Sequence, residues 1–195
     1  ARFTERLAAG MVERGHDVHV MAPSATRREH GTFTEVIEGQ PMTMHRITSH
    51  RYYPHDWLTF VLPWMAKYHA RKVLDEVNPA VVHIQSHIVI GRGLVREAHK
   101  RGIPVIATNH VMPENILDFT TLPPLLDKAV VTLAWADSKR TFEMTRAVTT
   151  PTRKAAEYLQ RTIEISEVYP VSCGLNASNY TPDLTPRDAN RILFV

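Results

Sequence analysis

Polar side chains follow three predicted strands, which cover residues 80–84, 104–108 and 167–171. In an open parallel sheet the carboxyl ends of the strands meet at one edge, where loops and helix N-termini form the ligand crevice. We therefore expect the residues just after these strands to bind a ligand. These candidates are Gln85, Ser86, His87, Asn109, His110, Glu114, Ser172, Cys173 and Gly174.

None of these groups is specific by itself. A histidine after a strand is also common as a hydrogen-bonded loop residue, and a doublet such as Asn109-His110 occurs by chance in many chains. Gly91 and Gly93 open a predicted helix, but the third glycine and the acidic residue of the dinucleotide-binding pattern are lacking. These two glycines alone therefore do not indicate a phosphate site.

The chain has eleven histidines but lacks the spacing of a metal site. His16 and His19 are assigned to one predicted strand and, being three residues apart, are expected to point to opposite faces. There is no Asp-x-Asp pair, and the single cysteine, Cys173, excludes a multi-cysteine site and an internal disulfide. We therefore expect no bound metal and no other cofactor. One cysteine also fits a reducing compartment such as the cytoplasm.

A predicted helix over residues 64–77 has two contrasting faces when its residues are placed at about 100° intervals. The apolar face consists of Ala66, Ala70, Val73, Leu74 and Val77. The basic and aromatic face consists of Trp64, Lys67, Tyr68, Arg71, Lys72 and Asp75. Such a face is either an ordinary solvated surface that covers a neighbouring loop, or a surface that binds a lipid interface or an acceptor.

Helical and strand patterns alternate along most of the chain, which predicts an α/β fold with a Rossmann-like parallel sheet and helices on both faces. Residues 24–40 are the least regular stretch, and residues 42–47 are expected to form a strand at the edge of a sheet. The predicted helices are 2–14, 62–77, 91–100, 122–136 and 152–161, and the other predicted strands, including those named above, are 17–22, 80–84, 104–108, 147–149 and 167–171.

Composition excludes several classes of protein. With 195 residues and 44% hydrophobic side chains the chain can bury one ordinary core. The net charge of +3 comes without runs of like charge, so nucleic acid is not an expected partner. The longest apolar stretch, residues 57–66, is well short of the ~20 residues of a spanning helix.

The pattern also suggests how the chain is divided. We expect one domain over residues 1–185 and, over residues 186–195, a linker followed by the first strand of a further domain. A strand and its turn are expected to precede the first helix, because in an α/β layout that helix would cross over from an earlier strand.

Six segments, taken in order, carry a family resemblance: residues 2–8 (RFTERLA), 14–20 (RGHDVHV), 81–87 (VVHIQSH), 102–110 (GIPVIATNH), 148–152 (VTTPT) and 170–175 (PVSCGL). Together they resemble the N-terminal domain of the retaining, two-domain (GT-B) glycosyltransferases of family four. Cys173 and Asn176 depart from the family's usual Ser-Asn-Gly-Ile/Val-Asp. The resemblance covers nearly the whole chain.

The resemblance implies roles for the candidate residues. His110 matches a cleft histidine that lies against the donor sugar and orients it or shares developing charge, which makes it the expected catalytic residue. Substrate-binding roles are expected for Asn109, Gln85, Ser86, His87, Glu114 and Gly174. The donor would be a nucleotide-sugar and no metal would be needed, because protein cations and a helix N-terminus offset the leaving diphosphate. The family's second domain supplies other donor-binding groups, so the 195-residue chain alone is expected to be inactive.

The acceptor follows from a narrower similarity. Residues 109–115 (NHVMPEN) resemble members that glycosylate membrane lipids, such as diacylglycerol or phosphatidylinositol mannosides. The surface Trp64, Lys67, Tyr68, Arg71 and Lys72 would then face the acceptor or an anionic membrane, with the protein cytoplasmic or peripheral on the inner face of the cell membrane. Two alternatives stay open: a soluble sugar-phosphate acceptor, and a non-catalytic Rossmann-like binding module.

Overall fold

The computed structural model describes residues 2–52, 55–113, 124–174, 177, 180–182, 184 and 185. The predicted strand over 191–195, and the whole of 186–195, lie outside these residues. In chain order the elements are α1 (Arg2–Glu13), β1 (His19–Pro23), β2 (Gly31–Ile37), β3 (Gln40–Ile47), β4 (His50–Tyr52), β5 (His55–Phe60), α2 (Pro63–Val77), β6 (Val82–Ile84), α3 (Ile90–Lys100), β7 (Val105–Thr108), α5 (Pro124–Phe142), β8 (Ala147–Thr150), α6 (Arg153–Ile163) and β9 (Val168–Pro170).

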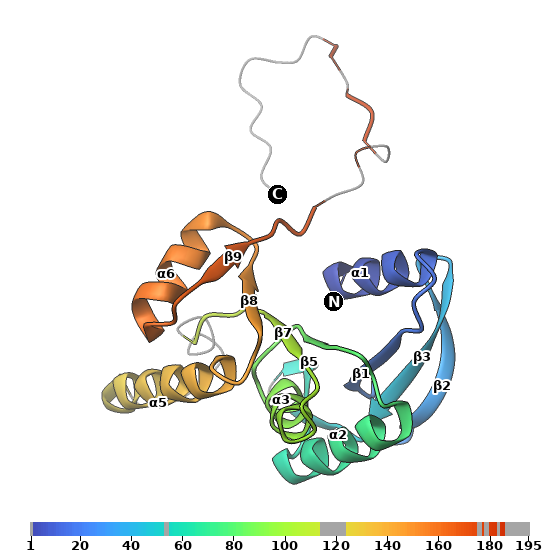
Figure 1. Ribbon diagram of the computed structural model, residues 1–195, viewed down its shortest axis with the longest axis horizontal. Helices are drawn as coiled ribbons and strands as arrows, with labels where there is room; N and C mark the ends of the chain where they lie inside the picture. Colours follow the sequence, from blue (N-terminus) through green and yellow to red (C-terminus); the bar gives the residue numbers. More distant parts are fainter. Residues whose placement is uncertain are drawn as a thin grey trace.

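The strands form two sheets and a hairpin (Figure 1). The larger sheet has the order β6-β7-β8-β9 with all strands parallel. In the smaller sheet β3 pairs with β1 in parallel and with β2 antiparallel, and β4 and β5 pair antiparallel. The α/β fold with a Rossmann-like parallel sheet is therefore confirmed.

One face of the parallel sheet forms the main core with α3, α5 and α6. Apolar side chains from the strands and helices bury one another there, and each fully buried valine, leucine, isoleucine or phenylalanine contributes roughly 1.5–3 kcal/mol. The buried members are Leu74, Val82, Ile84, Val95, Ala98, Val105, Ala107, Trp135, Phe142, Val148, Ala156, Leu159, Ile163 and Val168. Because side chains alternate along a strand, the opposite face carries the polar His83, Thr108 and Thr149.

The strand predicted at a sheet edge is wrong in position, because β3 lies in the centre of the smaller sheet. On one face Met44 packs with Ala8 of α1, and on the other Ile47 packs with Ala66 of α2. Polar residues in this strand made it resemble a half-exposed edge. One of them, His45, is buried and hydrogen-bonds His19 and Thr32 through its two ring nitrogens.

Within the segment that looked irregular, β2 is a regular strand. It joins β3 through Glu38 and Gly39, whose φ values of 49° and 81° are those of a two-residue turn with both residues left-handed. Glu35 of β2 accepts two hydrogen bonds from Arg46 of β3, at 3.0 and 2.7 Å. Cross-strand pairing therefore stabilises a strand whose own alternation of apolar residues is weak.

The hairpin β4–β5 was also missed, and α5 continues beyond its predicted end at residue 136 to Phe142. Ser138 and Thr141 make the last turns of α5 look polar, but both are fully buried and donate to main-chain carbonyls one turn earlier. Arg92 of α3 fixes the same turns through a 2.7 Å ion pair to Asp137. The other predicted helices and strands agree with the structure to within about two residues.

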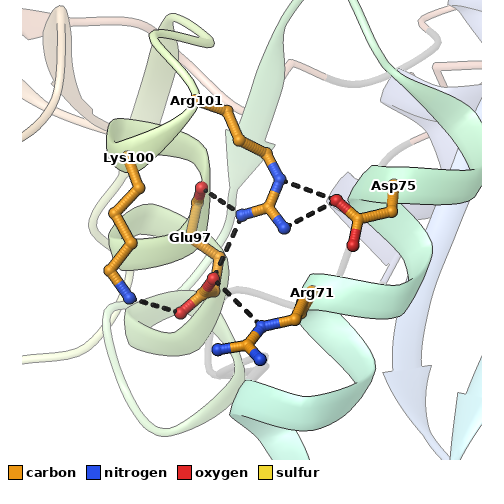
Figure 2. Close-up of polar contacts among 5 residues, drawn as sticks. All are labelled: Arg71, Asp75, Glu97, Lys100 and Arg101. Carbon is orange, nitrogen blue, oxygen red and sulfur yellow. Dashed lines mark hydrogen bonds and ion pairs between the residues drawn. The ribbon is translucent and has the colours of Figure 1, made fainter.

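A buried glutamate joins α2 to α3 (Figure 2). Glu97 of α3 is 2% exposed, and its carboxylate accepts hydrogen bonds from Lys100 at 2.7 Å and Arg101 at 3.0 Å. Arg71 of α2 lies 3.7 Å from the same carboxylate, and Arg101 also donates to Asp75 of α2. The hydrogen bond from Lys100 is the largest cause that lowers the pKa of Glu97, to about 2. The two helices therefore share an ionised, buried carboxylate.

Candidate functional site

The site lies where β6 and β7 end. His110 is the second residue after β7, Gln85 follows β6 directly, and His110 Nε2 lies 3.0 Å from Gln85 Oε1. The His110 side chain is exposed and that of Gln85 is half-buried. The structure therefore brings together two of the residues that the sequence predicted at the strand ends, and leaves one of them open to a ligand.

The first turn of α1 lies against His110. Phe3 contacts His110 edge to face, with ring centroids 5.1 Å apart and an interplanar angle of 63°. Free main-chain N–H groups and the positive end of the helix dipole make the N-terminus of a helix favourable for anions. A ligand bound at His110 would thus lie near the N-terminal end of α1.

A polar row crosses the parallel sheet beside this pair, on the face turned away from the main core. His83 Nε2 lies 2.8 Å from Thr108 Oγ1, which lies 2.8 Å from Thr149 Oγ1. The His83 side chain is exposed, although its Nε2 is hydrogen-bonded to Thr108. The Thr108 side chain is buried. Sequence reasoning did not select these three residues. The row depends on the register in which β6, β7 and β8 pair, which the local sequence pattern does not give.

Burial favours the neutral form of both histidines of the site. Burial disfavours the charged form of the His110 imidazole and thereby lowers its pKa. It lowers the pKa of His83 in the same way, and the nearby His110 lowers it further. Neutral imidazoles offer one N–H donor and one acceptor nitrogen each, which suits hydroxyl groups better than phosphate.

Two further predicted residues lie beneath the surface. Asn109 is 1% exposed and His87 is 5% exposed, with the His87 ring edge to face with Phe142. His87 Nδ1 and Asn109 Oδ1 are buried without a hydrogen-bond partner, a rare condition that calls for a reason. Burial also lowers the pKa of His87. In this conformation neither side chain is open to a ligand, and their binding role stays a prediction.

The loop after β6 is held in place by a close approach to α3. Ser86 Oγ accepts a hydrogen bond from the Ile88 main-chain N–H at 3.2 Å, and Val89 has the strained φ of 37°. A Cβ on Gly91 would lie 1.7 Å from the Ser86 carbonyl oxygen. Gly91 is therefore required by its contact with the loop that carries Gln85, rather than by a bound phosphate.

Replacing Gly91 with alanine is expected to lower the free energy of unfolding by about 2 kcal/mol, because the loop must move away from the helix. Urea unfolding measures this change. Gly10→Ala is the matched control, since Gly10 lies inside α1, where the nearest atom to its Cβ belongs to the flexible Arg14 side chain, and alanine favours helix. Equal stability of Gly91→Ala and the wild type would contradict the assigned role.

The remaining predicted residues are less informative. Glu114 lies outside the described residues. Gly174 is exposed with φ of 62°, and its main-chain N–H donates to Ser172 Oγ at 3.1 Å, so it shapes its own loop. Cys173 is exposed and free.

The outer face of α2 is exposed as predicted. Trp64 is 65% exposed and Tyr68 is 61% exposed. The basic residues differ from one another, because Arg71 reaches the buried Glu97 and Lys72 lies 3.6 Å from Glu76. Arg71 therefore contributes to holding α2 against α3, which the sequence pattern did not reveal.

Among the residues that the structure describes, no three His, Cys, Asp or Glu side chains gather as a metal site would require. Over the same residues, no helix combines the length and apolar character needed to span a bilayer.

Comparison with known families gives a match that extends over most of the chain. The family model of Glycosyltransferase Family 4 matches residues 1–179. The matched span contains both sheets, α1 to α6, and the site residues Gln85 and His110. No curated protein matches the chain.

Proposed function

The chain belongs to glycosyltransferase family 4, and we propose that it forms the acceptor-side half of a retaining enzyme that transfers a hexose from a nucleotide-sugar to a membrane lipid. The observation that carries this proposal is the exposed His110, oriented by Gln85 at the carboxyl ends of two parallel strands. In α/β sheets that edge is where ligands bind.

Transfer breaks the bond between the anomeric carbon and the phosphate oxygen, and the acceptor hydroxyl forms the new bond while its proton leaves with the diphosphate. Positive charge develops on the sugar ring and negative charge on the leaving group. A neutral His110, donating Nε2–H to Gln85, presents its other nitrogen to the sugar. The α1 N-terminus close to Phe3 favours the negative diphosphate. No metal is required for either effect.

The lipid acceptor is supported by the outer face of α2. Trp64 and Tyr68 are amphipathic aromatic side chains of the kind that settle at a bilayer interface, and Lys67 and Lys72 lie on the same helix. Arg71 is engaged with the buried Glu97, so the exposed basic charge of this face is carried mainly by Lys67 and by Lys72, which forms an exposed ion pair with Glu76.

A matrix of donors and acceptors tests the proposed function. The complete protein that contains this chain would be incubated with UDP-glucose, UDP-galactose, UDP-N-acetylglucosamine or GDP-mannose. The acceptor would be diacylglycerol in phosphatidylglycerol vesicles, or a soluble hexose phosphate. We expect one donor to be used, with product in the lipid fraction. Product only in the soluble fraction selects the sugar-phosphate alternative, and no transfer from any donor selects the binding module.

Membrane attachment has its own test. Each basic residue near an anionic bilayer contributes about 1 kcal/mol of attraction, so Lys67→Glu with Lys72→Glu is expected to weaken vesicle binding at least 10-fold. Sedimentation with phosphatidylglycerol vesicles measures binding, and added salt should weaken it in the wild type. Arg71 is left unchanged, because glutamate there would lie beside Glu97.

The control is Arg153→Glu with Lys154→Glu on α6, which changes the net charge equally on another exposed surface. If both double variants lose binding alike, total charge rather than the α2 face is responsible. If wild type and the α2 variant sediment equally, the membrane role is wrong and a soluble acceptor is the better reading.

A further inference from the structure

The polar row contains a histidine whose hydrogen positions can be worked out. His83, Thr108 and Thr149 lie on one face of three neighbouring parallel strands, turned away from the main core, and are linked by contacts of 2.8 Å and 2.8 Å. At the far end Thr149 Oγ1 donates to the Ala107 main-chain oxygen at 3.5 Å. A carbonyl oxygen can only accept, so this last contact gives the whole row a direction.

Only one arrangement of hydrogens satisfies all three contacts. Thr149 uses its hydroxyl hydrogen on Ala107, so Thr108 must donate to Thr149. Thr108 then accepts from His83, which must carry its hydrogen on Nε2. The neutral ring of His83 consequently keeps an unprotonated Nδ1, a hydrogen-bond acceptor. Because the row ends on a carbonyl that cannot take up a proton, it fixes a tautomer and does not conduct protons.

The Nδ1 atom of His83 has no hydrogen-bond partner among the described residues, and the side chain is exposed. Resting on the function proposed above, we propose that His83 is a second substrate-binding residue of the site at the ends of β6 and β7, whose Nδ1 accepts a hydrogen bond from a hydroxyl group of the transferred hexose or of the acceptor. Thr108 and Thr149 are positioning residues that act through His83.

This assignment explains why polar side chains are linked across three neighbouring strands. The buried Thr108 and the half-buried Thr149 could be replaced by valine without loss of packing, unless their hydroxyl groups orient something. The neighbouring His110 is oriented in a similar way by Gln85. The ends of β6 and β7 thus carry two neutral acceptor nitrogens, an arrangement suited to a polyhydroxylated ligand.

Two substitutions of His83 separate the roles of its two ring nitrogens. The amide of His83→Gln reaches the place of Nε2 and can still donate to Thr108, but it leaves no acceptor at Nδ1. The shorter His83→Asn places its oxygen near Nδ1. In the complete enzyme, with the nucleotide-hexose selected by the donor matrix, we expect His83→Gln to lower kcat/KM at least 10-fold and His83→Asn to stay within about 3-fold of wild type.

Deoxygenated substrates identify the hydroxyl. A series of monodeoxy donors and a series of deoxygenated acceptors would be compared on wild type and His83→Gln. One deoxygenated analogue should lower the kcat/KM of the wild type about 10-fold without lowering the kcat/KM of His83→Gln any further. If that analogue is a donor, His83 binds the transferred hexose, and if it is an acceptor, His83 binds the acceptor. Equal kcat/KM of His83→Gln and wild type overturns the proposal. If His83→Gln has a lower kcat/KM but every deoxygenated substrate affects it as much as the wild type, His83 has a structural role and the proposal is also overturned.

The tautomer is measured separately on ¹⁵N-histidine-labelled protein. Long-range ¹H–¹⁵N spectra should show His83 protonated on Nε2 at pH 7, and Thr108→Val should remove that preference. An Nδ1–H or charged His83 overturns the inference even if the enzyme is active. Absence of transfer by the wild type with every donor is a different result, because it overturns the proposed function on which the inference rests.

Discussion

Replacing His110 with alanine is expected to lower the kcat of the complete enzyme by about 100-fold or more, the size of effect that a polar group positioned at a developing charge provides. The side chain is exposed, so its removal leaves no buried cavity, and the melting temperature should stay nearly unchanged. Steady-state kinetics and thermal unfolding of the same preparation measure the two quantities. Because the pKa of His110 is lowered, activity should fall only as pH drops below that pKa and the ring becomes charged.

His99→Ala is the control, since His99 is an exposed histidine in the last turn of α3, away from the residues that follow β6 and β7. It should keep wild-type kcat. A His110→Ala protein with normal kcat would exclude a catalytic role. A protein that loses its fold would instead show that His110 is a structural loop residue.

The second large effect concerns stability. Glu97→Gln is expected to lower the free energy of unfolding at pH 7 by about 3 kcal/mol, because the variant keeps the shape of the side chain but leaves the cations around it without a buried carboxylate. Glu76→Gln removes an exposed glutamate from the neighbouring helix and should cost less than about 1 kcal/mol. Urea unfolding compares the three proteins.

The same variant has a defined pH dependence. The pKa of Glu97 is lowered from 4.5 to about 2, so its contribution is fully present above about pH 4.5 and is lost as the pH falls toward 2. The difference in stability between wild type and Glu97→Gln should therefore shrink over that range. A difference that stays constant with pH would show that packing, rather than charge, is what the substitution removes.

The parallel sheet and the corner at His110 could be predicted from the sequence, because both depend on local patterns. Short β-branched runs between helical segments gave the strands of the larger sheet, and the position of a residue after such a run places it at the carboxyl edge. Gln85 and His110 come from different strands and meet for that reason. Glycines at 15 and 102 marked helix ends with positive φ, as expected.

What the sequence did not reveal depends on contacts between distant segments. The central position of β3 rests on two partner strands, and β2 is stabilised by the Arg46–Glu35 ion pair rather than by its own alternation. The buried Glu97 draws Arg71 away from the solvated face of α2, which no helical wheel can show. The row through His83 likewise needed the register of paired strands.

The central claim is that the protein transfers a hexose and retains its configuration. Nuclear magnetic resonance of the anomeric proton tests it most directly, with the complete protein, an α-linked donor such as UDP-glucose or GDP-mannose, and dispersed diacylglycerol. The account predicts that the donor signal decays while an α-linked glycoside and free nucleoside diphosphate appear together. A β-linked product would contradict retention, and the absence of any new glycosidic signal with every donor would contradict transfer itself.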